Sequence, residues 1–127
     1  MSKDQNKKKY QTESELYAHR ISHFMLDKKA LDIKIIDVRE ITTLTDFFVI
    51  CTSESEPQSR AITDHINRSM KTEGNSSWHT EGYQNLDWVL VDFVSVVAHI
   101  FSKDARNYYE FERLWADANI LDIKDIQ

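Results

Sequence analysis

The stretch Trp88–Phe101, WVLVDFVSVVAHIF, contains two strand-like runs in direct succession, with one aspartate and one histidine inside an otherwise apolar sequence. A tight turn at Val94-Ser95 would pair the two runs as an antiparallel hairpin, in which side chains alternate between two faces. One face is wholly apolar and suits burial under helices: Val89, Val91, Phe93, Val96, Ala98 and Ile100. The other face, which we call the mixed face, consists of Trp88, Leu90, Asp92, Val97, His99 and Phe101.

The mixed face has two interpretations. Burying an unpaired carboxylate or imidazole costs free energy, so Asp92 and His99 among large apolar side chains are typical of a surface that contacts a partner. Alternatively, the face is partly solvated and the two polar side chains bond to nearby backbone, since scattered exposed apolar residues are common. A slip of one residue in the register would exchange the faces. Because valine disfavours positive φ, we expect ordinary negative φ angles at Val94-Ser95, or a different register.

The composition is typical of a single globular domain: 127 residues, of which 41% are hydrophobic and 29% are charged. No apolar run approaches the ~18 residues of a membrane span, and the N-terminal MSKDQNKKKYQTES lacks the apolar segment of a signal peptide. We therefore expect a cytoplasmic protein. The net charge of −5, with Lys7-Lys8-Lys9 as the only dense basic run, argues against a nucleic-acid-binding surface, DNA included. An acidic domain is more naturally drawn to a basic protein.

The order of elements predicts an α/β fold with a mixed sheet of five strands, flanked by helices on one or both faces. Apolar residues at helical spacing indicate a first helix, and Ser55, Pro57 and Gln58 form a capping-box pattern that starts a second one. Short β-branched and aromatic runs supply the strands. The expected order is a helix over 13–30, strands within 32–38 and 46–52, a helix ending at Gly74, a strand near 78–83, the hairpin, and a helix over 103–115.

This order of elements divides the chain into three segments. We expect a disordered basic tail over residues 1–12, a single α/β domain over 13–118 and a C-terminal tail over 119–127. Isoleucines alternate with acidic residues in the last segment, which predicts a tail that packs weakly or frays.

The sequence contains no pattern typical of a cofactor-binding or metal-binding site. Gly74 and Gly82 are the only glycines, and neither opens a helix after a strand as a phosphate-binding loop requires. His19, His23 and Asp27 share a face of the first helix, but the glutamate of a metalloprotease helix is missing between the histidines. We therefore expect neither a metal nor a cofactor.

The sequence gives little support to either of two candidate catalytic pairs, Cys51 with His99 and Asp87 with Asp92. Cys51 lies in the middle of an expected strand, where a free cysteine is most often a small buried hydrophobe. Its pKa would not be lowered there, which argues against a thiol nucleophile with His99 as its base. Asp87 and Asp92 are five positions apart, so a regular strand places them on opposite faces. The sequence therefore favours a binding protein over an enzyme.

Four segments carry a family resemblance: TDFFVICT over 45–52, WVLVDF over 88–93, VVAHIF over 96–101 and YYEFERLW over 108–115. In this order they resemble the ribosomal silencing factor family, RsfS, also called the Iojap-like family, and the resemblance spans about residues 13–118. It implies a nucleotidyltransferase-like α/β fold without the transferase site. It also implies a non-enzymatic protein that binds the L-fourteen protein of the large ribosomal subunit and sterically blocks joining of the small subunit, which represses translation.

The same resemblance points to residues of the mixed face. The family's partner-contacting sheet residues fall on Trp88, Leu90 and Asp92, with His99 nearby. Two other classes of function stay open. One is a degenerate nucleotidyltransferase-like enzyme or nucleotide-binding protein, and the other is a scaffold whose mixed face is a homodimer seam.

Overall fold

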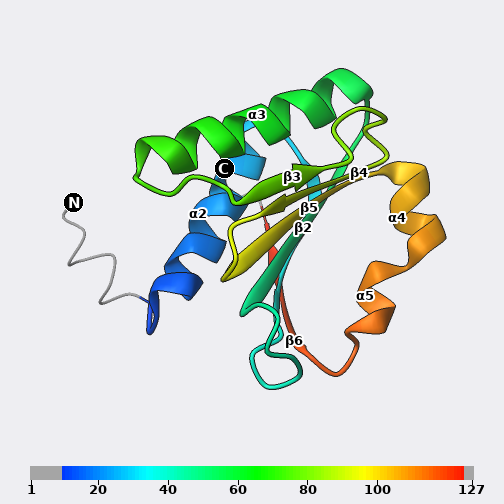
Figure 1. Cartoon of the computed structure of the whole chain (residues 1–127). Coiled ribbons are helices and arrows are strands. Elements are labelled where there is room, and N and C mark those ends of the chain that lie inside the picture. The colour runs from blue at the N-terminus through cyan, green and yellow to red at the C-terminus, as the bar shows by residue number, and fades with distance from the viewer. Residues whose placement is uncertain (1–9, 125–127) are drawn as a thin grey trace.

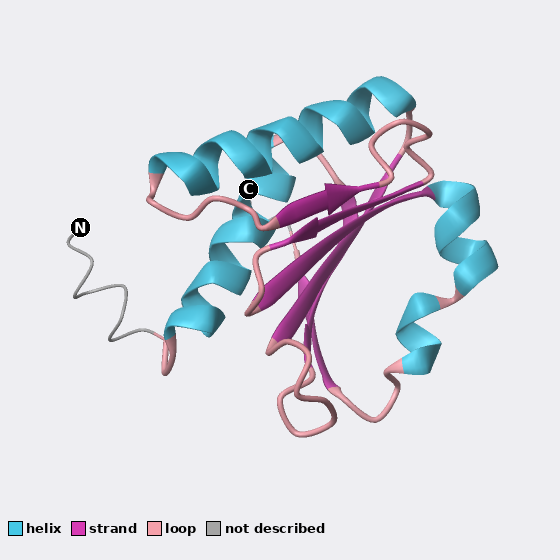
Figure 2. Cartoon of the chain, viewed as in Figure 1, coloured by secondary structure: helices cyan, strands magenta, loops and turns pink. Residues whose placement is uncertain are grey.

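The computed structural model describes residues 10–124 as a layered α/β fold. Helices α2 and α3 cover one face of a six-stranded sheet, and α4 and α5 run along the other (Figure 1). Figure 2 shows the same layers coloured by secondary structure. Within the described residues, no helix has both the length and the apolar character needed to cross a membrane. In chain order the elements are α2 Glu13–Asp27, β1 Leu31–Asp37, β2 Phe47–Ser53, α3 Glu56–Thr72, β3 His79–Glu81, β4 Trp88–Asp92, β5 Val96–Ser102, α4 Lys103–Tyr109, α5 Phe111–Leu114 and β6 Asn119–Ile123.

The sheet is mixed, with the strand order β3-β4-β5-β2-β1-β6. Strands β2 and β5 pair in parallel, and the remaining neighbours pair antiparallel. A mixed α/β fold with flanking helices, as predicted from the sequence, is therefore confirmed. Two hydrophobic clusters lie on its two faces. The larger one packs the sheet against α2 and α3 and includes the apolar face of the hairpin. The smaller one lies beneath α4 and α5 and is built around Ile36, Ile50, Phe101 and Phe111.

The strand count differs from the expectation of five, which was wrong. Strand β6 pairs antiparallel with β1, so residues assigned to a C-terminal tail complete the sheet. Ile123 packs against the larger cluster, and Asp122 lies 3.6 Å from the Lys34 ammonium on the other face. Leu121 and Ile123 thus lie on the face of the larger cluster, and Ile120 and Asp122 lie on the other face. Of the expected basic tail, residues 1–9 lie outside the described part of the chain.

The hairpin has the register expected from the sequence, but its turn does not have the expected geometry. Val94 has a φ of 74°, so the prediction of negative φ angles was wrong. The backbone N–H of Ser95 donates to the carbonyl of Phe93 at 2.9 Å, which forms a γ-turn centred on Val94. The backbone N–H of Val94 donates to a carboxylate oxygen of Asp92 at 2.7 Å. These two bonds support a conformation that valine alone disfavours.

The last helix is broken where the sequence predicted a continuous one. Glu110 has a left-handed backbone with φ of 48°, which separates α4 from α5. The break turns Phe111 toward the sheet, where its side chain is buried. We call residues 103–114, which contain both short helices, the strap.

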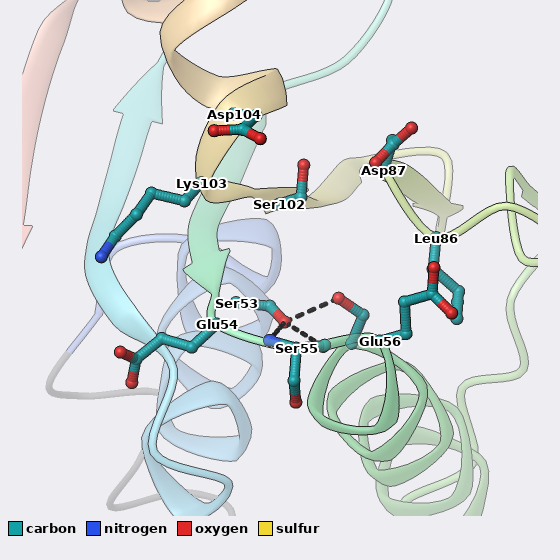
Figure 3. A pocket seen from close by; sticks show the side chains of 10 residues that line it. Ser53, Glu54, Ser55, Glu56, Leu86, Asp87, Ser102, Lys103 and Asp104 are labelled. Atoms are coloured by element: carbon teal, nitrogen blue, oxygen red, sulfur yellow. Dashed lines mark hydrogen bonds between the residues drawn. The ribbon is translucent and has the colours of Figure 1, made fainter.

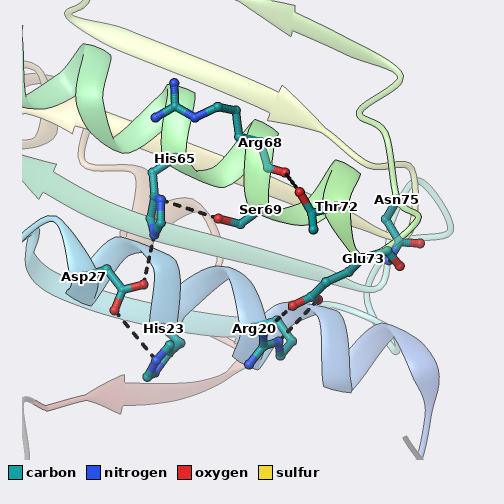
Figure 4. Close-up of polar contacts among 9 residues, drawn as sticks. All are labelled: Arg20, His23, Asp27, His65, Arg68, Ser69, Thr72, Glu73 and Asn75. Carbon is teal, nitrogen blue, oxygen red and sulfur yellow. Dashed lines mark hydrogen bonds and ion pairs between the residues drawn. The ribbon is translucent and has the colours of Figure 1, made fainter.

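Polar contacts join α2 to α3 above the larger cluster (Figure 4). Arg20 forms an ion pair with Glu73 at one end. At the other end, Nε2 of His65 and a carboxylate oxygen of Asp27 are hydrogen-bonded at 2.9 Å, and His23 lies 3.7 Å from the second oxygen. Asp27 thus connects the two helices.

Candidate partner-binding surface

The strap covers half of the mixed face. His99 and Phe101 lie beneath it and are 3% and 0% exposed. Trp88, Leu90 and Asp92 lie on β4, and each is only half-buried. The structure therefore divides the mixed face into a buried floor and an accessible line of side chains. We call Trp88, Leu90 and Asp92 the β4 row.

Trp88 is held by both its side chain and its backbone. Its indole Nε1–H donates to Nδ1 of His99 at 2.9 Å. Its ring packs against the rings of Phe101 and Tyr109, each at a centroid distance of 4.9 Å. Gly82 adopts φ of +81°, and a Cβ built there would lie 2.0 Å from the carbonyl oxygen of Trp88. Only glycine fits at this position of the turn. Its missing side chain lets the turn pack directly against the backbone of Trp88.

His99 is enclosed by aromatic rings on the buried floor. The ring centroids of Phe111 and Phe48 lie 4.5 and 5.1 Å from its own, and Phe101 stacks on it at 6.0 Å. Burial lowers the pKa of His99 to about 3, so the imidazole is neutral near neutral pH. Its Nε2 has no hydrogen-bond partner within the described part of the chain. The structure does not favour a direct contact between His99 and a partner, and connects His99 to the β4 row through Trp88.

Strand β3 extends the mixed face beyond the hairpin. His79 lies opposite Asp92 and Glu81 lies opposite Leu90, so both side chains point to the same face. Their side chains are 40% and 62% exposed, and Nε2 of His79 lies 3.3 Å from the Glu81 carboxylate. The sequence alone does not reveal that both residues lie on this face, because a strand of three residues carries no register signal of its own. Only its pairing with β4 places them beside the β4 row.

A polar pocket of about 300 Å³ lies beside the start of β4 (Figure 3). It opens where the parallel strands β2 and β5 end and where α3 and α4 begin. Carboxylates outnumber cations in its lining, which disfavours phosphate groups. Across residues 10–124, no group of three or more His, Cys, Asp or Glu side chains is placed to hold a metal ion. The pocket therefore gives little support to nucleotide binding; its charged residues are Glu54, Glu56, Asp87, Lys103 and Asp104.

Cys51 and His99 lie on opposite faces of the sheet. Cys51 belongs to the larger cluster under α2 and α3, whereas His99 lies beneath the strap. Burial raises the pKa of the Cys51 thiol to about 12, so the thiolate is not populated at neutral pH. The prediction that Cys51 is a buried core residue is confirmed.

Fold and surface together define the class: an α/β protein with a mixed six-stranded sheet, of which one face is covered by helices and the other is half covered. The family model described as ribosomal silencing factor during starvation matches residues 11–127. The chain belongs to this family, which confirms the resemblance noted in its strands and last helix. Membership connects the chain with ribosome silencing and the regulation of translation.

Relatives from other organisms agree with this assignment. The ribosomal silencing factor RsfS of Bacillus subtilis is 40% identical over 97 residues, which cover 76% of this chain and 82% of the relative. The RsfS protein of Halalkalibacterium halodurans is 37% identical over 100 residues, covering 79% and 86% of the two chains. A crystal structure of a Chromobacterium violaceum protein superposes with a TM-score of 0.80 at 28% identity, covering 83% of this chain and 88% of that one.

Proposed function

We propose that this chain binds the large ribosomal subunit through its L-fourteen protein, prevents the small subunit from joining, and so represses translation in the cytoplasm. The observation that carries the proposal is the β4 row, in which Trp88, Leu90 and Asp92 form one accessible line on the sheet of a ribosomal silencing factor. The nucleotidyltransferase-like character of the fold stays a prediction from the resemblance.

The chemistry of the surface fits a basic protein partner. Trp88 is a large aromatic side chain held in place by its neighbours, the type of residue that dominates binding energy at interfaces. Asp92 and Glu81 both lie next to Leu90, one along β4 and one across from it. A hydrogen bond from a charged partner group to such a carboxylate contributes about 1.5–3 kcal/mol. The net charge of −5 favours approach to a basic surface.

The layered fold gives a physical reason for the block. A domain docked through the mixed face keeps α2 and α3 on the opposite side of the sheet (Figure 1). These helices would project away from the large subunit. A small subunit that approaches the same region would collide with this layer. The steric bulk of the bound domain is therefore sufficient to block subunit joining.

Co-sedimentation with isolated large ribosomal subunits tests the contact. Trp88→Ala removes the aromatic anchor and is expected to weaken binding about 30-fold or more, the effect of a hot-spot residue. A matched pair is Leu90→Ala and Leu121→Ala, because Leu121 is a partly exposed leucine on β6 at the opposite edge of the sheet. We expect Leu90→Ala to bind weakly and Leu121→Ala to bind as the wild type does. Full binding by folded Trp88→Ala and Leu90→Ala would place the contact elsewhere.

Two further readouts separate the parts of the proposal. Purified L-fourteen protein should bind the wild type and not Trp88→Ala, which tests the named partner. Light scattering of mixed subunits should show slower subunit association with the wild type than with Trp88→Ala. Tight binding that leaves association unchanged would refute the steric block while keeping the contact.

A further inference from the structure

The hydrogen bond between Trp88 and His99 fixes the tautomer of the histidine. An indole N–H can only donate, so Nδ1 of His99 must be unprotonated to accept it at 2.9 Å. A neutral imidazole then carries its proton on Nε2. That atom is buried and has no partner within the described residues.

The stability of the fold alone does not explain a histidine at this position. A buried donor without an acceptor destabilises the folded state, and an apolar side chain of similar shape would avoid that cost. His99 is nevertheless enclosed by the rings of Phe48, Phe101 and Phe111. What histidine adds over phenylalanine at this position is the acceptor at Nδ1, and its observed partner is Trp88.

The surrounding rings also determine where that acceptor points. Phe101 stacks on the imidazole with an angle of 12° between the ring planes, and Phe111 closes over it from the strap. Leu90 lies directly opposite His99 in the pairing of β4 with β5. His99 is therefore fixed beside the β4 row, and its Nδ1 selects one orientation of the half-buried indole.

We infer that His99 is a positioning residue for the proposed contact with the large ribosomal subunit: by accepting the Trp88 indole N–H within its aromatic enclosure, it presets the tryptophan for the partner. The inference rests on the proposed function, because it assigns Trp88 to the interface. Presetting a side chain lowers the entropy lost on binding. The effect is therefore expected in affinity for the subunit and in the state of the indole.

Two substitutions separate the acceptor from the ring. His99→Phe keeps an aromatic ring and removes the acceptor, whereas His99→Asn places an amide oxygen near the position of Nδ1 and removes the ring. Co-sedimentation with isolated large subunits gives the affinity of each folded variant. The indole N–H signal of Trp88 in a ¹H–¹⁵N NMR spectrum, assigned with Trp88→Ala, reports the hydrogen bond.

We expect His99→Phe to bind about tenfold more weakly than the wild type, with a displaced indole signal. His99→Asn should retain a signal near that of the wild type and bind more tightly than His99→Phe. Equal binding by the two variants, or tighter binding by His99→Phe, would overturn the inference. Trp88→Ala distinguishes a failure of the proposed interface from a failure of the positioning role alone. If it binds as the wild type does, the proposed interface is wrong; if it loses binding while His99→Phe does not, only the positioning role is wrong.

Discussion

Burial keeps two titratable side chains of the sheet neutral. The pKa of His99 falls to about 3 and the pKa of Cys51 rises to about 12. The cause is the same for both, because a poorly solvated site disfavours the charged form of either group. Near neutral pH, His99 therefore offers an acceptor to Trp88, and Cys51 is a small packing group.

The lowered pKa of His99 predicts that stability decreases in mild acid. A histidine in the unfolded chain takes up a proton near pH 6.5, whereas folded His99 stays neutral until about pH 3. Below pH 6.5 the unfolded state thus binds more protons, and the free energy of unfolding falls by up to about 1.4 kcal/mol per pH unit from this group. Urea unfolding of the wild type and His99→Phe at pH 7.5 and 5.0 should show a larger loss for the wild type.

The comparison isolates His99, because both proteins share every other titratable group. Above pH 6.5 its contribution is fully present in the wild type, so the difference between the two proteins should be constant there. Equal losses between pH 7.5 and 5.0 would mean that folded His99 titrates like an exposed histidine.

Alternation along the hairpin was sufficient to predict which side chains share a face, because a two-residue turn fixes the register. Trp88, Leu90 and Asp92 could be grouped in this way. The burial of His99 could not be predicted, because its cover is Phe111, which reaches the sheet only after a break at Glu110 that has neither glycine nor proline as a signal. The conformation of Val94 depends on hydrogen bonds that only the folded turn supplies.

At the scale of the element, one buried arginine fixes the strap to the sheet. Arg106 donates to the carbonyl of Asp32 at 2.6 Å, to the hydroxyl of Thr52 at 2.9 Å, and to both carboxylate oxygens of Glu112 at 3.1 and 3.2 Å. Lys34 lies 3.1 Å from the same carboxylate. Burial alone would raise the pKa of Glu112, but the hydrogen bonds and charges of Arg106 and Lys34 lower it below its ordinary value. The strap therefore depends on an ionised Glu112.

Removal of this arginine should destabilise the fold. Arg106→Ala takes the donor away from the Thr52 hydroxyl and the Asp32 carbonyl and leaves Glu112 paired with Lys34 alone. A buried polar group left without its partner costs about 1–3 kcal/mol, and we expect a loss of this size. The matched control is Arg113→Ala on the same strap, because its side chain is 79% exposed and its ion pair with Glu110 lies at the surface. That change should stay within about 0.5 kcal/mol. Chemical denaturation measures both, and similar losses for the two variants would show that Arg106 does not fix the strap.

At the scale of the whole molecule, the last strand determines how the sheet ends. Strand β6 covers the outer edge of β1, which would otherwise present unpaired backbone groups. Its pattern was visible in the sequence but was compatible with a loose tail, because the segment is short and its few isoleucines and one leucine are interspersed with charged and polar residues. The partner strand, β1, is distant in the chain, and local pattern alone does not reveal such a pairing.

A chain that ends at Ala118 should therefore be less stable than one that ends at Lys124. The shorter chain loses β6, including Ile120, Leu121 and Ile123, which are partly covered in the fold. Full burial of such a side chain contributes about 1.5–3 kcal/mol, so three half-covered ones contribute about 3 kcal/mol in total. Urea unfolding at several protein concentrations measures the loss, and the uncovered edge of β1 should also make the shorter chain self-associate. If the two chains unfold at the same urea concentration, then β6 does not stabilise the sheet.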